Sequence, residues 1–563
     1  MPITPTYPGV YIQEVQSSVH TIVGVPTSVA AFVGYAARGP VADTPVQVNS
    51  WADFVRAFGG FDPSSQVKDA AFPMNYAVFL FFMNGGNSAQ IVRAAMPGEG
   101  GSGAAARIAL PPESGPAEIG LVATSPGTWG NNLQVVVDTK NLKNPATQFN
   151  LTITETGIGG VSVASESYTG LSVGAGGLGA STGGIGITTA LASSALMNVD
   201  TANSNLTTGT KPPAVGTYFP EPPPKAKPAA EGESAGEGQS DAGAKPAPPV
   251  SSLGVDVPVP TAASPLDVVP VDGTTGIYAL VKADIFNMLC LPTTWKQTYP
   301  PATLGDVATF CAQKRAMLIV DPPTAWSQAT PPLTFETVNG TAALGGPDTA
   351  NAATYYPNLL VSDPVTGATV QLGPCGAVAG VWASTDDARG VWKAPAGTAA
   401  AIAGISDLAV HIDDGESGVL NPIAVNCLRT LPLAGPVSWG ARTAAGADED
   451  ASQWKYISVR RTALFVEESI RRGTQWAVFE PNDEPLWSSI RLNIGAFMNS
   501  LFTQGAFQGS TPGEAYLVQC DADNNPQNSI DLGILNILVG FQPLMPAEFV
   551  IIQIEQLVGQ LQG

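Results

Sequence analysis

The residues that could form a hydrolytic site in this sequence are few. Only two histidines occur, His20 and His411, so a serine–histidine relay would have to use one of them. His411 precedes Asp413-Asp414, an order that could supply a base and its carboxylate. A G-x-S-x-G pattern at 179–183 lies in a glycine-rich tract without the strand–turn–helix context of a nucleophile elbow. We interpret the histidine and its aspartates as a strand end followed by a polar turn, and expect no catalytic residue.

Patterns that hold phosphate or calcium are equally incomplete. Two G-x-G-x-x-G matches begin at Gly98 and Gly174, in low-complexity runs without a βαβ frame. Residues 521–525 imitate the first ligands of a calcium loop, but Pro526 stands where such a loop needs Gly and Leu532 where it needs Glu. The sequence predicts a turn between two strands there, with no metal site and no cofactor.

Asp321 is the remaining candidate for an active-site carboxylate. It ends a predicted buried strand at 315–321, a common position for catalytic acids, and Pro322-Pro323 follows it. Asp and Pro also form turns readily, and we favour a structural turn at this position.

Composition limits the class of protein. The chain has 563 residues, enough for three or four domains, with 61 Gly, 49 Pro and only 13% charged residues. Its net charge of −21 argues against nucleic acid as a partner. Five scattered cysteines without a CxxC pair predict buried free thiols in a reducing cytoplasm. No signal peptide is evident, and the longest apolar run, 77–83, is too short for a membrane span.

The stretch at 373–395 is the one around which the other elements are arranged. Gly376 and Gly380 are among the small residues that allow close backbone approach, and Trp382 and Trp392 are large anchors that need burial. A charged segment, Asp386 to Gly390, lies between the two indoles. The pattern predicts a densely packed helix–turn unit in a core.

This stretch, with LNPIAVNCLRT at 420–430 and SWGART at 438–443, closely resembles the tail sheath proteins of contractile phages and related injection systems. FFMNGGNSAQIVR at 81–93 and SPGTWGNNLQVVV at 125–137 extend the resemblance. It covers most of the chain outside about 140–275. A core similar to the subtilisin-like domain of sheaths is implied as a likeness of fold only.

The expected fold class is α+β and multi-domain, with an α/β core, a β-rich insertion and a compact C-terminal α/β domain. The expected divisions are an N-terminal arm at 1–20, core parts at 21–95 and 276–435, an insertion at 96–275 and a C-terminal domain at 436–563. Within the insertion, the Pro/Gly/Ala-rich segment at about 211–262 is expected to be a disordered loop, most clearly at Glu221–Pro249, which has almost no apolar side chains and is expected on the surface. Helices are predicted at 51–58 after the N-cap residue Ser50, at 73–83 with a proline near the start, at 456–472 with one apolar stripe, and from 483 to about 505. Strands are predicted at 29–35, 89–94, 133–138, 149–154, 515–520, 534–541 and 548–554.

Both termini have the alternating pattern of extended strands. An edge strand of its own domain would explain the N-terminal pattern equally well. The resemblance implies instead that the arm adds a strand to a neighbouring subunit, and the final strand gives each subunit a second linking element. The expected linking residues are Val10, Tyr11, Ile12, Val15, Phe549, Ile551 and Ile554.

The predicted helix at 456–472 is basic, against the acidic trend of the chain. Glu467–Arg471 and Glu468–Arg472 are spaced as supporting i,i+4 pairs. Lys455, Arg460 and Arg461 lack an acid at i±3 or i±4, which predicts that their charge is available. A solvated polar face is one interpretation; the resemblance implies the other, a contact with acidic residues on an inner tube.

The function expected from the resemblance is structural and non-enzymatic: a subunit that polymerises helically around a tube and contracts to drive it through an envelope. Implied partners are other copies in stacked, hexameric rings, the tube protein, and baseplate and terminator proteins, with no nucleic acid and no membrane. Assembly in a bacterial cytoplasm, into a phage tail or injection-system particle, is implied. The alternatives are a non-contractile virion or tail protein and an α/β hydrolase.

Overall fold

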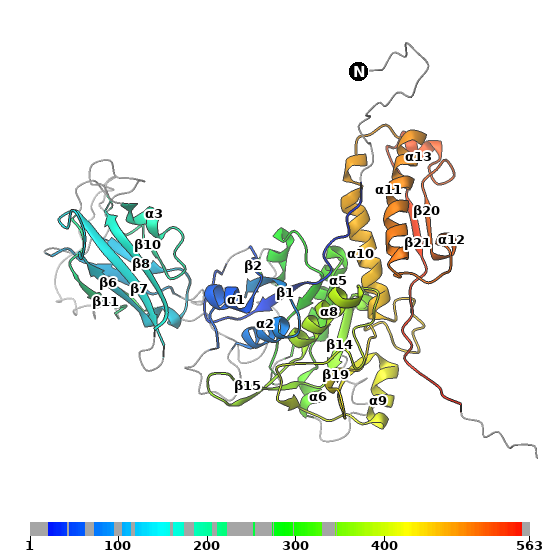
Figure 1. The fold of residues 1–563 in the computed structure, drawn as a ribbon, viewed down its shortest axis with the longest axis horizontal. Coiled ribbons are helices and arrows are strands. Elements are labelled where there is room, and N and C mark those ends of the chain that lie inside the picture. The colour runs from blue at the N-terminus through cyan, green and yellow to red at the C-terminus, as the bar shows by residue number, and fades with distance from the viewer. Residues whose placement is uncertain are drawn as a thin grey trace, which may run out of the picture.

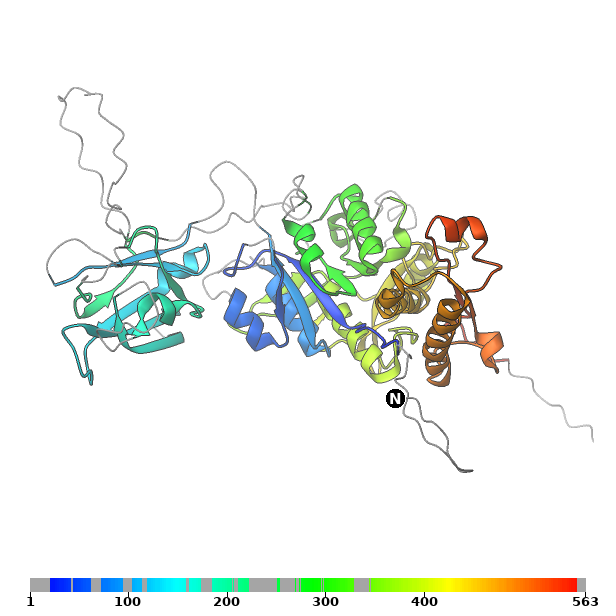
Figure 2. The same ribbon diagram turned by 90° about the horizontal axis from the view of Figure 1, so that it is seen from above.

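The computed structural model of the chain has three parts arranged along its long axis (Figures 1 and 2). The structure describes residues 21–41, 44–61, 72–94, 104–113, 119–157, 162–173, 185–204, 206, 211–221, 251–253, 269, 273, 275–294, 296, 298–328, 344 and 346–553. A β-rich insertion lies at one end, the α/β core in the middle and a helical C-terminal part at the other end. The mixed α/β class expected from the sequence is confirmed.

The core is an eight-stranded sheet in which six parallel strands are flanked by an antiparallel strand at each edge. Their order is β19 (Gly435–Ser438), β18 (Val425–Leu431), β14 (Ala352–Tyr356), β13 (Met317–Val320), β12 (Met288–Cys290), β1 (Val29–Gly34), β3 (Ser88–Arg93) and β2 (Val46–Val48). Every residue of β1 and β13 is buried, as expected for strands covered on both faces. Because β19 pairs with β18, the expected start of the C-terminal domain at 436 falls inside the core sheet.

Helices cover both faces of this sheet. One face carries α1 (Trp51–Phe58), α2 (Pro73–Met83) and α8 (Cys375–Arg389); the other carries the 3₁₀ helix at Gly276–Lys282, α5 (Pro301–Lys314), α6 (Thr324–Gln328) and α9 (Asp414–Leu420). As predicted, Ser50 caps α1, its hydroxyl accepting from the Asp53 N–H at 3.1 Å. A small sheet of β15 (Leu359–Ser362), β16 (Thr369–Leu372) and β17 (Asp407–Leu408) packs on the first face.

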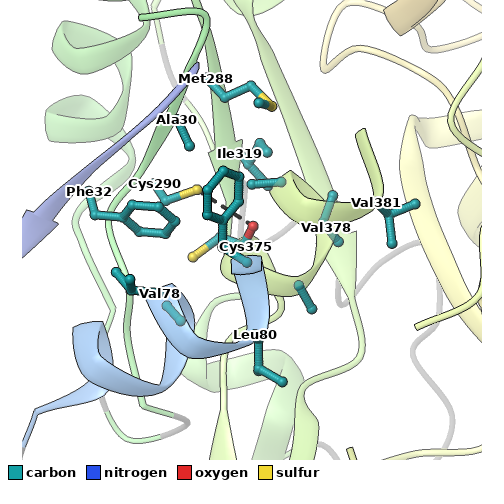
Figure 3. Close-up of a cluster of buried hydrophobic side chains, with 14 of the residues drawn as sticks. Ala30, Phe32, Val78, Leu80, Met288, Cys290, Ile319, Cys375, Val378 and Val381 are labelled. Atoms are coloured by element: carbon teal, nitrogen blue, oxygen red, sulfur yellow. Dashed lines mark hydrogen bonds between the residues drawn. The ribbon is translucent and has the colours of Figure 1, made fainter. Parts of the chain in front are cut away.

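The predicted helix–turn unit is α8, which packs against α2 (Figure 3). A Cβ added at Gly376 would overlap the carbonyl oxygen of Ala77, and one at Gly380 would lie 2.6 Å from that of Phe81. The two glycines therefore allow the helix backbones to touch, as predicted. The Cys290 thiol in β12 donates to the Cys375 carbonyl oxygen at 3.5 Å inside the same cluster.

The charged segment after Trp382 is not a turn. α8 continues to Arg389 and ends at Gly390, whose φ of +87° suits glycine. Asp386 is buried on the helix, so the three-residue charge cluster that indicated a turn is the last helical turn, with one carboxylate facing inward.

The insertion contains a five-stranded and a three-stranded antiparallel-rich sheet around one buried cluster. The larger sheet is β11 (Gly216–Tyr218), β6 (Leu133–Asp138), β7 (Gln148–Thr156), β8 (Ser162–Ser172) and β9 (Ile185–Gly186); the smaller is β10 (Met197–Val199), β5 (Ile119–Ala123) and β4 (Arg107–Leu110), with α3 (Ile187–Leu191) and a 3₁₀ helix at Thr128–Asn132 nearby. Since β11 pairs with β6, part of the segment at 211–262 is ordered, contrary to expectation. Residues 222–249 of the expected loop lie outside the described residues.

The entry and exit of the insertion pair with each other. Arg107 and Ser252 exchange two backbone hydrogen bonds of 2.8 and 3.0 Å. The core side is joined to the insertion through Arg38, which lies over the Trp129 ring at 5.3 Å from its centroid and forms an ion pair with Glu155.

The C-terminal part packs two helices against a two-stranded sheet. Its elements are α10 (Ile457–Gly473), a 3₁₀ helix at Gln475–Ala477, α11 (Glu484–Thr503), α12 (Pro512–Ala515), β20 (Tyr516–Gln519), α13 (Gln527–Asp531) and β21 (Leu538–Phe541). α10 contributes Ile457 and Leu464 to the core cluster and Val466 to the C-terminal cluster, so this helix joins the two parts. Within the described residues, no helix is both long and apolar enough to cross a lipid bilayer.

Candidate assembly interface

The two-stranded sheet of β20 and β21 presents unpaired strand edges. The two strands pair only with each other in the described part of the chain. The sheet rests on α11, where the Tyr516 hydroxyl donates to the Gly495 carbonyl oxygen at 3.4 Å. Leu517 and Leu538 are exposed on it. An isolated two-stranded sheet is marginal, and its open edges can accept further strands.

The C-terminal tail is the longest run of exposed large apolar side chains in the described residues. Phe549, Val550, Ile551 and Ile552 are 73 to 84% exposed. Residues 548–553 form no strand, so the predicted strand at 548–554 is wrong for the isolated chain. The physical reason is that a strand needs a hydrogen-bonded partner, and none of the described residues pairs with the tail. Ile554 and the expected N-terminal linkers Val10, Tyr11, Ile12 and Val15 lie outside the described residues.

The expected tube-contact residue Arg461 is buried inside the protein. Its side chain is 3% exposed and forms a bidentate ion pair with Asp386 of α8, at 2.8 and 2.6 Å. Its guanidinium also lies 4.9 Å from the Trp382 ring centroid and donates to the Thr27 carbonyl oxygen. Burial raises the pKa of Asp386, although the Arg461 charge opposes that rise. The expectation that the Arg461 charge is uncompensated is wrong, because its partner lies on another helix.

Arg460 and Lys455 are also engaged within the chain. Arg460 hydrogen-bonds Asn351 at 3.0 and 3.2 Å, lies over the Trp454 ring and is 3.7 Å from Glu467. Lys455 forms an ion pair of 2.6 Å with the half-exposed Asp448. Their charges are therefore partly compensated, contrary to expectation. These contacts within the chain do not decide whether Arg460 and Lys455 also contact a tube.

The predicted pairing at the end of α10 is partly correct. Glu468 pairs with Arg472 as expected, at 2.7 Å, but also with Arg471 at 2.6 Å. Partial burial would raise the pKa of Glu468, but hydrogen bonds from the two arginines outweigh it and lower this pKa to about 2. Glu467 instead faces Arg460 and Arg315.

Asp321 is a partly buried cap for α8. Its carboxylate accepts from the Cys375 N–H at 2.8 Å and from the Thr293 N–H and hydroxyl at 3.1 and 3.2 Å. The Cys375 N–H is one of the unpaired donors at the start of α8, where Pro374 offers no side-chain cap. Burial raises the pKa of Asp321 to about 6, against the lowering effect of these hydrogen bonds. The structural interpretation of this residue fits its contacts.

The other candidate chemical groups are not assembled into a site. His411 is an exposed surface residue whose ring pairs with Asp407 at 3.2 Å, while Asp413 caps α9 in a reciprocal capping box with Glu416. All five cysteines are buried and free, as predicted. The G-x-S-x-G pattern, both glycine-rich matches and His20 lie outside the described residues. In the described part of the chain, no group of three or more His, Cys, Asp or Glu could hold a metal ion.

The resemblance is tested by comparison with known proteins. The family model of the phage tail sheath C-terminal domain matches residues 449–556, which include α10, α11 and the β20–β21 sheet. The tail sheath protein of Vibrio phage KVP40 is 31% identical over 157 residues, 28% of this chain and 22% of that protein. This chain is therefore similar to tail sheath proteins, and its residues 449–556 match their C-terminal domain.

A second curated sheath protein also matches part of this chain. The tail sheath protein of Burkholderia phage BcepMu is 28% identical over 196 residues, 34% of this chain and 39% of that protein. The alignments thus span well under two thirds of the curated sheath relatives.

Solved structures share the fold over nearly the whole chain. A chain of the anti-feeding prophage helical sheath in its contracted state is 21% identical, with a TM-score of 0.52 over 98% of this chain and 100% of that one. The sheath tail protein from Listeria innocua is 13% identical, with a TM-score of 0.54 over 93% and 96% of the two chains. These likenesses show that the sheath fold extends beyond the matched C-terminal domain.

Proposed function

We propose that this chain is the structural subunit of a contractile sheath. Many copies polymerise helically around an inner tube and contract to drive the tube through a target envelope. The observation that carries the proposal is the sheath C-terminal domain together with an open two-stranded sheet and an exposed apolar tail on the same chain. The fold shared with a sheath chain in a contracted assembly supports it.

The subunits are linked by strand addition. The N-terminal arm, through Val10, Tyr11, Ile12 and Val15, and the tail, through Phe549, Ile551 and Ile554, supply strands to the β20–β21 edges of neighbouring copies. A donor on one surface and an acceptor on another make a heterologous contact, which propagates as rings or helices. Phe549 and Ile551 are exposed in the single chain, and such a contact would bury them.

The remaining partners follow from the proposed role. They are the tube protein, baseplate and terminator proteins, and stacked six-membered rings of the same chain, assembled in a bacterial cytoplasm. The α10 region containing Lys455, Arg460 and Arg461 lies in the C-terminal part proposed to face the tube. Of these three, Arg461 acts through its ion pair in positioning α10, and Lys455 carries the most accessible charge. New contacts between subunits, rather than chemistry at a residue, supply the energy of contraction.

Electron microscopy of the purified full-length chain tests this function. We expect helical tubes that are long and narrow around the inner tube, and short and wide without it. A variant ending at Glu548 should remain a folded monomer and form no tubes, because it lacks the tail. The exposed substitution Leu433→Ser, which removes an apolar side chain outside the tail, is the matched control and should assemble normally.

Two outcomes contradict the proposal. Polymers of a single length under both conditions indicate a non-contractile tail protein. Normal sheaths from the truncated variant exclude the tail as a linker.

A further inference from the structure

Arg442 of the SWGART segment is the most completely buried arginine side chain among the ion pairs of the described residues. Its side chain is 1% exposed. It lies four residues after β19, and its N–H donates to the Asn426 side chain of β18 at 2.7 Å, next to the edge of the core sheet. A buried guanidinium requires partners for its donors, because an unpaired buried charge is very unfavourable.

The main partner of Arg442 comes from the C-terminal tail. Its Nε and Nη2 donate to the two carboxylate oxygens of Glu548 at 2.9 and 2.7 Å, a bidentate pairing. The Tyr456 hydroxyl donates to the same carboxylate at 3.3 Å. Nη1 donates to Asp448 and to the Asn421 carbonyl oxygen, each at 2.9 Å. We call the Arg442–Glu548 pair the tail clamp.

The tail clamp lies between a segment that is hydrogen-bonded to the β20–β21 sheet and the exposed tail. Before it, the Gln542 N–H donates to the Ala515 carbonyl oxygen at 2.8 Å, which holds the chain next to its own sheet. After it, Phe549 to Ile552 are exposed. Between residues 542 and 548 the chain crosses from the C-terminal part back to the core. There the Glu548 side chain pairs with buried Arg442, and the exposed run begins at the next residue.

We propose that the tail clamp fixes the point from which the C-terminal tail leaves the core, and so selects which neighbouring copy receives it. The proposal rests on the proposed function. Without the clamp, the last anchored residue becomes Pro543, which forms a β-bridge with Phe507, and residues 544–548 are released. Five extended residues span about 17 Å, enough to bring the tail to a different neighbour in a closely packed lattice. Arg442 and Glu548 are thus positioning residues for subunit linkage.

The clamp is tested first in the monomer, by the distance between two spin labels. Because all five native cysteines are buried, labels can be attached to new cysteines at two exposed positions, Ala547→Cys next to the clamp and Leu433→Cys on the core. We expect one narrow distance distribution in the otherwise native chain. Glu548→Gln, which keeps the size and removes the charge, should broaden it severalfold, whereas Glu480→Gln at an exposed position should not.

The second readout is the order of the assembled polymer. Glu548→Gln should still polymerise, since the tail and the acceptor sheet are intact, but its polymers should be irregular, with loss of the helical layer lines seen for the native chain. The Glu480→Gln control should retain them. Thermal unfolding of each variant checks that the monomers are folded.

The outcomes separate the clamp from the sheath function. A broad distribution in the native monomer overturns the clamp directly and needs no variant to fold. A narrow distribution in folded Glu548→Gln, or native helical order in its polymers, overturns it as well. Failure of the native chain to polymerise would instead contradict the proposed function, and with it the proposal that the clamp selects a neighbour. The distances measured in the monomer would still establish whether Arg442 holds the tail at Glu548.

Discussion

At the residue scale, the glycines of α8 determine how closely two helices pack. Gly376 faces the Ala77 carbonyl oxygen across the α2–α8 contact, where no Cβ fits. We expect Gly376→Ala to destabilise the core by about 1–3 kcal/mol through overpacking, lowering the thermal midpoint measured by circular dichroism.

A matched glycine provides the control for that substitution. Gly418 lies in α9 with no atom within 4 Å of an added Cβ. Gly418→Ala should be neutral or stabilise by up to about 1 kcal/mol, because alanine has the higher helix propensity. Equal thermal midpoints for Gly376→Ala and Gly418→Ala would show that the helices have room to separate.

Asp321 makes a pH-dependent contribution to stability at the same scale. Its pKa of about 6 in the folded chain is above the usual 3.8. The folded state therefore binds the proton more tightly, and this contribution, up to about 3 kcal/mol, is present below pH 4 and lost as the pH rises through 6. Asp321→Asn cannot gain it.

Thermal midpoints at pH 7 and pH 4 measure that difference. Acidification should lower the midpoint of Asp321→Asn more than that of the native chain, whereas Glu480→Gln should respond as the native chain does. An identical response of Asp321→Asn and the native chain would mean that Asp321 titrates at the same pH in the folded and unfolded states.

At the element scale, α10 is held to the core by the ion pair between Arg461 and Asp386. The local sequence pattern had predicted that the Arg461 charge lacks an acidic partner. Arg461→Met leaves Asp386 buried without its partner, and we expect a loss of about 3–5 kcal/mol in the free energy of unfolding, whether or not the tube is present. Lys455→Met removes a partly exposed pair and should cost about 1 kcal/mol or less. Denaturant titration of the two monomers measures the contrast.

Lys455→Met is also the cleaner probe of the proposed tube contact. Because its fold should be nearly unchanged, a fall in the yield of extended sheaths around the tube would report lost attraction. Normal extended assembly of this variant, together with a stable Arg461→Met monomer, would contradict both roles.

Elements with strong local patterns could be predicted from the sequence. The Ser50 cap, the proline at the start of α2 and the apolar stripe of α10 gave helices at the expected positions. Partners distant in the sequence could not. Arg461 meets Asp386 across 75 positions, and no i±4 search can find such a pair. The tail strand failed for a related reason, since the tail has no pairing partner among the described residues.

At the scale of the whole molecule, the likeness to tail sheath proteins and the shared fold were predictable, whereas the contacts between distant segments were not. The resemblance rested on residues of α8 and the SWGART segment, whose contacts now have physical explanations in the α2–α8 packing and in Arg442. The crossing of the chain from β21 back to Arg442 joins segments 106 positions apart. Only the three-dimensional arrangement shows that the tail leaves from the core.

The paired entry and exit of the insertion have a practical consequence. Arg107 and Ser252 lie side by side and exchange two backbone hydrogen bonds, so the chain enters and leaves the segment between them at adjacent residues. A foreign domain with neighbouring termini could therefore replace the insertion without separating any strand of the core sheet. In a regular polymer, each copy of the chain would then display one copy of the cargo at a fixed spacing, making the protein a candidate scaffold for ordered arrays of enzymes or antigens.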